Sequence, residues 1–315
     1  MKSVLITGAG GLIGTRVSES ARQSGYAVTS IFHSLPVTAP PDALQRDLRL
    51  PLENVPPADM IFHLAGGYAG AGKQLLERTD FLMARNVIQW GIDHGVKEWV
   101  FASAAEVFGN VAGIATEEGP TRPVIPYGHI KLEIERLFAQ IVTGLPGCRV
   151  VILRMGEVYG GQSRLLHELA MRLRHGFCPL PGSGRVPVSF VHVDDVALAF
   201  MRAAEFAPPG VSIYNVADDE PATWRAFADY CGEILGTRHP LFLPRPLLYA
   251  YMLGHQLRSR FCGRQPVLTG HALRLLTTPK ALSNHKIKSE LGFQPRFPNF
   301  RCGLEASLDG LSHHT

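Results

Sequence analysis

The feature that most constrains the fold is the string TGAGGLIG, which spans Thr7 to Gly14. An apolar run typical of a strand precedes it and a helical pattern follows it, which is the context of a dinucleotide-binding βα unit. Gly8 permits the tight turn, Gly11 lets the backbone approach a pyrophosphate, and Gly14 allows close packing of the helix on the strand. The start of the helix then offers unpaired N–H groups to phosphate.

The same strand and helix alternation continues along the first half of the chain. We expect strands over residues 3–7, 27–32, 60–64, 98–103 and 149–153, and helices over 12–24, 76–94 and 127–142. Alternation of this kind predicts an α/β protein with the Rossmann fold, a doubly wound parallel sheet that carries helices on both faces.

Beyond about residue 160 the regular alternation stops. Helices are expected over 164–174, 194–205 and 223–235, and short strands over 188–193 and 212–216. We therefore expect a Rossmann domain of residues 1–160 plus about 188–217, to which the chain returns, and a smaller, discontinuous substrate-binding cap of residues 161–187 and 218–315.

Composition narrows the class of partner. Charged residues make up 18% of the chain, below the usual ~25%, while 46% is apolar, which favours a large buried fraction or apolar ligands. The net charge of +4 is small and scattered, so nucleic acid is not an expected partner. No apolar stretch is long enough for a membrane span.

The cysteines indicate a reducing compartment. The five cysteines are widely separated and include no CxxC pair, so neither a disulfide framework nor a zinc site is expected. A cytoplasmic location fits this pattern, and no metal site is predicted. His192, Asp194 and Asp195 lie close in sequence, but we interpret them as a strand end followed by a helix cap.

The expected end of the second strand bears on the choice of cofactor. An NAD site usually places Asp or Glu there on the adenosine ribose, whereas this chain has His33 and Ser34. The absence of a carboxylate slightly favours NADP, although the Arg that usually meets the 2′-phosphate is absent too. We expect NAD(P), and His33 is equally well explained as a surface histidine.

Several strings together resemble the extended short-chain dehydrogenase/reductase family, of the NAD-dependent epimerase/dehydratase type. Besides TGxxGxxG and YGHIK (127–131), they are RDL (46–48), FHLAG (62–66), VFASAAEVFG (100–109), LRMGEVYG (153–160), SFVHVDDVA (189–197) and ELGFQPR (290–296). This resemblance implies a cofactor site formed by Gly8, Gly11, Leu12, Ile13, Gly14, His33, Ser34, Asp47, Leu48, Leu64, Ala65, Gly66, Tyr127, Lys131 and Met155.

Tyr127 and Lys131 are the expected catalytic pair. Four residues apart on a helix, they project from one face, and a nearby ammonium lowers the pKa of a tyrosine from its usual ~10. The family resemblance implies that Tyr127 exchanges a proton with the substrate oxygen and that Lys131 also holds the nicotinamide ribose.

One catalytic group of the family is missing. The pattern that carries a Ser or Thr three positions before Val107 places Ala104 there, and the neighbouring Ser103 is expected to point to the opposite face of a strand. Three alternatives remain: a bulge turns Ser103 inward as the third catalytic residue, another donor holds the oxygen, or catalysis is reduced.

Four further positions bear on the substrate. Glu106 lies where dehydratases and decarboxylases of the family carry a catalytic Glu, but its partners are absent here, so a solvated or hydrogen-bonded Glu is the better interpretation. Glu157 and Val188 replace an Asn and an Arg that hold a sugar nucleotide in epimerases of the family. Arg185 is a candidate replacement for that Arg. These departures disfavour a diphosphate substrate.

The last helical segments resemble the lid of reductase members such as 3β-hydroxysteroid dehydrogenases. They cover residues 241–261 and 266–276, and an apolar stripe (Leu247, Leu248, Tyr251, Met252) lines either a pocket, a cap core or a dimer face.

The favoured function is an NAD(P)-dependent oxidoreductase that acts on a carbonyl or secondary alcohol of a mostly apolar small molecule. The alternatives are a nucleotide-sugar epimerase/dehydratase with tightly bound NAD and a non-catalytic dinucleotide-binding regulator. A small-molecule substrate is the expected partner, and a homodimer is compatible with the sequence.

Overall fold

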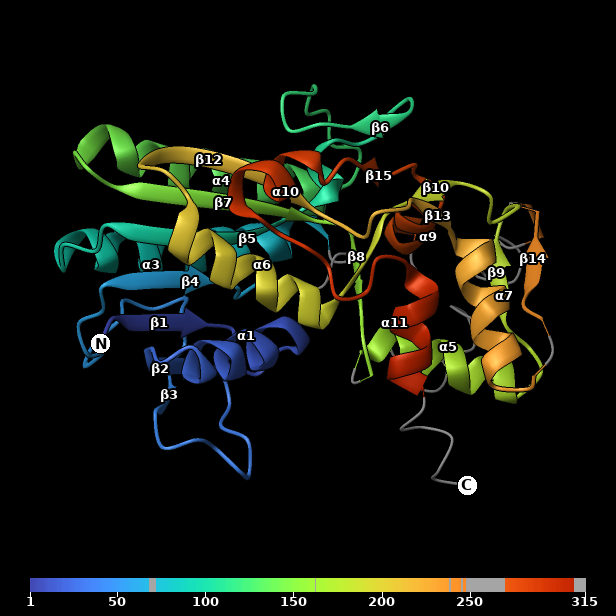
Figure 1. The fold of residues 1–315 in the computed structure, drawn as a ribbon, viewed down its shortest axis with the longest axis horizontal. Coiled ribbons are helices and arrows are strands. Elements are labelled where there is room, and N and C mark those ends of the chain that lie inside the picture. Colours follow the sequence, from blue (N-terminus) through green and yellow to red (C-terminus); the bar gives the residue numbers. More distant parts are fainter. Residues whose placement is uncertain (68–71, 162, 238, 245, 248–269, 309–315) are drawn as a thin grey trace.

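The computed structural model describes residues 1–67, 72–161, 163–237, 239–244, 246–247 and 270–308 (Figure 1). Its centre is a seven-stranded sheet in the order β12-β7-β5-β4-β1-β2-β3, in which all neighbours run parallel. The strands are β1 (Ser3–Thr7), β2 (Ala27–Phe32), β3 (Ala43–Gln45), β4 (Met60–His63), β5 (Glu98–Ala104), β7 (Arg149–Met155) and β12 (Gly210–Val216). The predicted Rossmann fold is confirmed.

Helices cover both faces of this sheet, as Figure 1 shows. Val4 and Ile6 of β1 pack with helices α1 (Leu12–Gln23) and α6 (Val193–Phe206), whereas Leu5 packs toward α3 (Leu82–Asp93) and α4 (Pro126–Gly144). Alternate side chains of a strand point to opposite faces, so both faces need apolar residues and the strands form continuous apolar runs.

The strand order reverses between β1 and β4. The chain builds β1, β2 and β3 outward in one direction and then β4, β5, β7 and β12 in the other. Open α/β sheets bind ligands at the carboxyl ends of the strands on either side of such a reversal. The ends of β1 and β4 carry Thr7 and His63, next to the glycine string.

The helix expected over 76–94 is interrupted. The structure has α2 (Lys73–Leu76), a π-helical turn η1 (Glu77–Phe81) and then α3. The wide turn brings the carboxylate of Asp80 inward, where it accepts hydrogen bonds from the backbone N–H of Gly67 at 2.8 and 2.9 Å. A π-helical turn of this kind often marks a functional site.

The expectation that residues 188–193 rejoin the main sheet is wrong. β10 (Pro187–Val188) pairs with β13 (Ala222–Thr223), and β11 (Phe190–His192) pairs with β8 (Glu157–Tyr159), in separate two-stranded sheets. β12 does return to the main sheet, beside β7. Phe190 explains the difference, because its ring stacks on Phe227 in the neighbouring cluster and not on the central sheet.

The second part of the chain packs around its own apolar cluster. Phe190, Phe227 and Phe300 lie at its centre, between α5 (Arg164–Arg174), α7 (Trp224–Ile234) and α11 (Phe300–Leu308). The other short elements of the chain are β6 (Ile114–Ala115), β9 (Pro179–Pro181), β14 (Leu241–Leu243), α9 (Gly270–Thr277), β15 (Ala281–Leu282) and α10 (His285–Leu291), of which α10 packs on the core of the central sheet. Of the apolar stripe, Leu247 is exposed and the other three residues lie outside the described residues.

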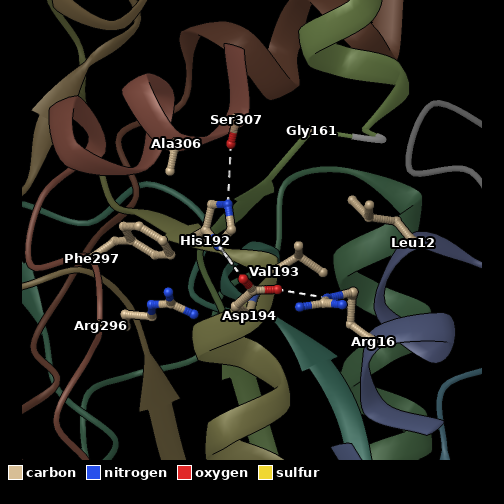
Figure 2. Close-up of a pocket in the computed structure, with 10 residues that line it drawn as sticks. All are labelled: Leu12, Arg16, Gly161, His192, Val193, Asp194, Arg296, Phe297, Ala306 and Ser307. Atoms are coloured by element: carbon tan, nitrogen blue, oxygen red, sulfur yellow. Dashed lines mark hydrogen bonds and ion pairs between the residues drawn. The ribbon is translucent and has the colours of Figure 1, made fainter. Parts of the chain in front are cut away.

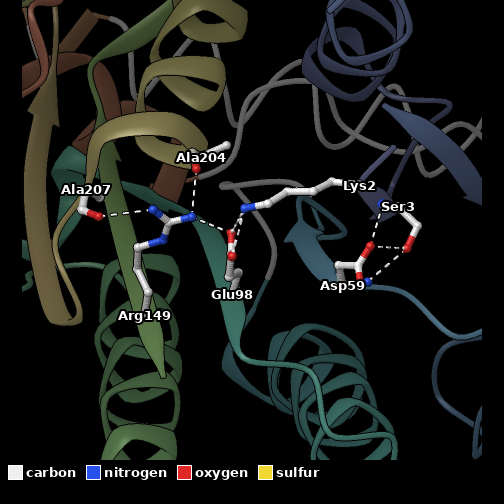
Figure 3. A network of polar contacts seen from close by, with 7 residues as sticks. All are labelled: Lys2, Ser3, Asp59, Glu98, Arg149, Ala204 and Ala207. Carbon is white, nitrogen blue, oxygen red and sulfur yellow. Dashed lines mark hydrogen bonds and ion pairs between the residues drawn. The ribbon is translucent and has the colours of Figure 1, made fainter. Parts of the chain in front are cut away.

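Polar contacts join the amino ends of the strands (Figure 3). Glu98 at the start of β5 forms ion pairs with Lys2 and with Arg149 at the start of β7. The Arg149 guanidinium also donates to the backbone oxygens of Ala204 and Ala207, at 2.7 and 3.0 Å. One guanidinium therefore ties two strands to the last turn of α6, at the edge opposite Thr7.

Within the described residues, no helix is long and apolar enough to cross a membrane.

Candidate active site

The glycine string forms the expected bend at the end of β1. Gly8 has a positive φ of 72°, and a Cβ on it would lie 2.7 Å from the backbone nitrogen of Ala65. A Cβ on Gly14 would lie 2.1 Å from the Gly8 oxygen, so α1 approaches the bend more closely than any side chain permits. Glycine is therefore required at both positions.

Gly11 differs because the space on its side is open. It is the N-cap of α1, no side chain caps the helix, and no acidic residue stands in the first turn. A Cβ on Gly11 would meet the Gly8 oxygen at 3.4 Å, an ordinary contact. The N–H groups of the first turn, at Leu12 and Ile13, thus remain for an anion. This bend fits the pyrophosphate of a dinucleotide.

A hydroxyl ties the bend to the next strand. Thr7 Oγ1 shares a hydrogen bond with Nδ1 of His63 at 2.8 Å and accepts from the backbone N–H groups of Leu64 and Ala65 at 3.2 and 3.3 Å. Burial lowers the pKa of His63 to about 3, so its ring is neutral. The predicted stretch from Leu64 to Gly66 is thereby fixed beside the glycines.

The predicted adenosine-side residues follow β2 and β3. His33 and Ser34 are exposed after β2, and Leu48 is buried after β3. Between them, Asp47 pairs with Arg49 at 2.6 Å, and this hydrogen bond lowers the pKa of Asp47 to about 2. The Asp47 carboxylate is thus already partnered.

Tyr127 and Lys131 share one face of α4, as predicted. The Lys131 ammonium lies 5.5 Å from the centre of the Tyr127 ring and donates to the backbone oxygen of Ala102 at 3.0 Å. A Cβ on Gly66 would lie 3.3 Å from that ammonium and 3.2 Å from Oδ2 of Asp80. No described residue forms a hydrogen bond with the Tyr127 hydroxyl, which leaves it available to a ligand.

The charges around Tyr127 do not act as expected from the sequence. Burial, together with Glu106, Asp80 and Glu157, raises the pKa of Tyr127 above its usual range. Burial also lowers the pKa of Lys131, although Asp80 opposes that change. The expected lowering by Lys131 is therefore outweighed, because burial and then three carboxylates disfavour the negative charge of a phenolate. Tyr127 is a neutral phenol in this environment.

Ser103 is held away from Tyr127 by a buried network. β5 pairs with β7 in unbroken register through Ser103 and Ala104, so no bulge turns the hydroxyl. Instead Ser103 Oγ donates to Glu135, which forms a buried ion pair with Arg154 at 2.8 Å. The position of the missing hydroxyl, Ala104, ends β5 and precedes the turn η2 (Ala105–Val107).

The two predicted substrate carboxylates meet at a lysine that the sequence analysis missed. The Lys280 ammonium bonds Glu106 at 2.8 Å and also bonds Glu157. Lys280 is 3% exposed, and its backbone N–H donates to the backbone oxygen of Pro187 in β10. Nothing in the string TTPKAL marks this lysine, because only the pairing of a distant segment brings it here. Arg185, by contrast, is exposed in the loop before β10.

Met155 and the His192 group complete the predicted residues. Met155 is buried at the end of β7. His192 caps α6 by accepting from the Asp194 N–H at 3.2 Å, and Asp195 accepts from the backbone of Arg296 and Phe297. The strand-end and cap interpretation is confirmed, with the imidazole as the capping group. No metal-ligating cluster occurs among the residues that the structure describes.

A cavity of about 350 Å³ adjoins the glycine bend (Figure 2). An ion pair of 2.7 Å between Arg16 and Asp194 crosses one side, and His192 contacts Ser307 at 3.1 Å on the other. The lining residues are Leu12, Arg16, Gly161, His192, Val193, Asp194, Arg296, Phe297, Ala306 and Ser307. Leu12 connects this cavity to the start of α1, but Tyr127 is not part of it.

The fold and site define a dinucleotide-binding α/β protein with a tyrosine and a lysine at the carboxyl edge of its sheet. The model of the NAD dependent epimerase/dehydratase family matches residues 4–217, and the chain belongs to this family. The resemblance to the extended short-chain dehydrogenase/reductases is thereby confirmed.

Individual relatives are more distant. The chain is 31% identical over 177 residues to a 3-diazoavenalumate denitrifying reductase from a Streptomyces species, over 55% of this chain and 50% of that protein. It is 26% identical over 277 residues to the 3beta-hydroxysteroid-dehydrogenase/decarboxylase isoform 1 of Arabidopsis thaliana, over 81% of this chain and 63% of that protein. The matches thus span half to somewhat under two thirds of these relatives.

Solved structures show the same fold. MoeE5 in complex with UDP-glucuronic acid and NAD superposes with a TM-score of 0.79 at 23% identity, over 99% of this chain and 100% of that one. At this identity the likeness concerns the fold.

Proposed function

We propose that the protein is an NAD(P)-dependent oxidoreductase that transfers hydride between a nicotinamide and a carbonyl or secondary alcohol of a mostly apolar small molecule. The observation that carries this proposal is the pair of Tyr127 and Lys131. They lie on one face of α4, beside a glycine bend that fits a dinucleotide. No described residue forms a hydrogen bond with the Tyr127 hydroxyl.

The cofactor, when bound, supplies or accepts the hydride. The bend at Gly8, Gly11 and Gly14 holds its pyrophosphate. Lys131, fixed by the Ala102 oxygen, directs its ammonium toward Gly66, where a side chain would crowd it. Tyr127, kept neutral by burial and by the surrounding carboxylates, donates its proton to the oxygen of a reduced carbonyl.

The charges at the site support a substrate without a diphosphate. Glu106 and Glu157 lie close enough to Tyr127 to raise its pKa, and an anionic ligand there would be repelled. Val188 offers no charge, and Arg185 stays in its exposed loop. Relatives named as a reductase and as a hydroxysteroid dehydrogenase also favour this reading.

The cofactor preference is part of the proposal. Membership of an NAD-dependent family supports NAD. We propose that NADP is also accepted, and slightly preferred, because no carboxylate directly follows β2 and Asp47 is partnered by Arg49.

The test is the absorbance of reduced cofactor at 340 nm. Purified protein is mixed with NADH or NADPH and either a 3-oxosteroid or phenanthrenequinone, a neutral apolar diketone. Net oxidation of the added cofactor with either ketone supports the oxidoreductase. UDP-glucuronic acid is the matched probe for the alternative function. NAD that copurifies without exchanging, together with binding of UDP-glucuronic acid, would instead support a nucleotide-sugar epimerase, the function that the family name and MoeE5 favour.

A further inference from the structure

The proposed reaction needs a second hydrogen-bond donor to the substrate oxygen, and the usual hydroxyl is missing at Ala104. A carbonyl oxygen that gains negative charge during reduction is stabilised by hydrogen bonds in addition to the one from its proton donor. Ala104 has no hydroxyl to offer, and the Ser103 hydroxyl is already engaged by the buried Glu135. A second donor must therefore come from elsewhere in the site.

Lys280 is a buried donor with unused capacity. An ammonium has three N–H groups, and Glu106 and Glu157 take two of them. No other hydrogen bond of this ammonium is found among the described residues. Burial alone would lower the pKa of Lys280, but Glu106 and Glu157 together raise it above its usual range, so the group stays charged.

The cluster stands beside Tyr127. Glu106 comes two residues after Ala104, in the turn η2, and a Cβ on Gly128 would lie 2.3 Å from its backbone oxygen. The start of α4 therefore rests directly on the residue that holds Lys280. Gly128 directly follows Tyr127, so Glu106 lies next to the start of the helix that carries the phenol. The raised pKa of Tyr127, to which both carboxylates contribute, agrees with this arrangement.

We propose, on the basis of the function proposed above, that Lys280 donates a hydrogen bond to the reacting oxygen of the substrate, in place of the hydroxyl that Ala104 lacks. Glu106 and Glu157 are positioning residues that fix the direction of the ammonium and keep it charged. No bond other than this hydrogen bond is formed by Lys280, and the proton still comes from Tyr127.

A buried ion pair with a purely structural role is the competing explanation. One carboxylate neutralises one ammonium, whereas here two carboxylates surround it, and the second adds desolvation cost without a charge to match. A third partner that accepts the remaining N–H of the ammonium would give the second carboxylate a role, because two carboxylates fix the direction of the ammonium more narrowly than one.

The first test restores the missing hydroxyl. Ala104→Ser is a small change, and kcat for phenanthrenequinone with NADPH is measured in this variant. Because Lys280 already holds the oxygen, kcat is expected to change by less than about threefold. An increase of about tenfold or more would overturn the proposal, since it would show that the donor was vacant.

The second test removes the Lys280 ammonium and then restores activity with a hydroxyl at position 104. Lys280→Met is expected to lower kcat by about 100-fold or more, and Ala104→Ser added to that variant is expected to recover at least about tenfold. Both variants are compared by thermal midpoint, which the added serine should leave unchanged. A kcat in Lys280→Met within about threefold of wild type, or no rescue, contradicts the proposal.

These outcomes separate the two proposals. If the wild type turns over a ketone and kcat is unchanged in Lys280→Met, the proposed role of Lys280 is wrong but the proposed oxidoreductase activity is supported. No wild-type turnover with either ketone contradicts both. If Lys280→Met does not fold, the Ala104→Ser variant alone still decides the matter, because it keeps the cluster intact.

Discussion

The carboxylate of Glu135 joins three segments, because it accepts from Ser103 of β5 and pairs with Arg154 of β7 while standing on α4. Both charged side chains are about 4% exposed. Glu135→Ala leaves the Arg154 guanidinium buried without its partner, and the free energy of unfolding is expected to fall by about 3–5 kcal/mol.

Urea denaturation followed by circular dichroism measures this loss. The matched control is Lys73→Ala, which removes an exposed ion pair with Glu77 and should cost less than about 1 kcal/mol. Equal losses in the two variants would contradict the structural role of the buried network.

Asp218 is a buried carboxyl whose two oxygens have no hydrogen-bond partner among the residues that the structure describes. Burial, then Asp195 and Asp219, raise the pKa of Asp218 to about 9, while the His192 backbone opposes this. Since the folded pKa lies above the unfolded value of ~4, the protonated form stabilises the fold, and that stability is lost as pH rises from about 4 through 9.

Asp218→Asn mimics the protonated form at every pH. Its free energy of unfolding is expected to match wild type near pH 4 and to exceed it by at least about 1 kcal/mol at pH 8. Urea titrations at several pH values measure the difference. A gap that is constant with pH would show that Asp218 does not titrate in this range.

At the scale of elements, the glycines of the bend have two different roles. Gly14 allows α1 to pack closely on the bend, whereas Gly11 leaves space for a ligand. Gly14→Ala would force a Cβ to 2.1 Å from the Gly8 oxygen, so α1 must move. We expect this variant to lose both stability, by about 1–3 kcal/mol, and NADH binding.

In Gly11→Ala, the added Cβ meets only an ordinary contact of 3.4 Å with the Gly8 oxygen. The free energy of unfolding of Gly11→Ala should stay within about 1 kcal/mol of the wild-type value. Its affinity for NADH should be lower, because the added methyl group enters the space where the glycine bend would hold the pyrophosphate.

Equilibrium unfolding and NADH fluorescence titration distinguish the two changes. Unchanged NADH affinity in the folded Gly11→Ala variant would count against the placement of the pyrophosphate.

Local patterns predicted most elements, and longer-range contacts set the rest. Apolar runs and glycines are local signals, so β1, β2 and α5 have the predicted limits to within a residue or two. The turn η1 was not predicted, because what draws Asp80 inward is the distant Gly67 backbone. Lys280 was missed for the same reason, since its partners Glu106 and Glu157 lie more than 100 residues away.

At the scale of the molecule, the two ends of the sheet have different tasks. The carboxyl ends carry Thr7, Ala104 and the proposed chemistry, while the amino ends carry the ion pairs of Glu98 (Figure 3). Arg149→Met removes the link between β5, β7 and α6. We expect the free energy of unfolding to fall by about 2–4 kcal/mol and kcat/KM of the folded variant to stay within about twofold.

Denaturation and steady-state assays of the same preparation test this division. A large loss of kcat/KM in folded Arg149→Met would show that the two edges are coupled.

We propose above that Tyr127 delivers the proton to a reacting oxygen beside a bound nicotinamide. Wild type and Tyr127→Phe are compared in the rate of NADPH oxidation by phenanthrenequinone and in the dissociation constant of NADPH from fluorescence. We expect the rate to fall by about 100-fold or more and the dissociation constant to change by less than about threefold. Equal rates in the two proteins, with cofactor still bound, would contradict this proposal and would favour a binding protein without catalysis.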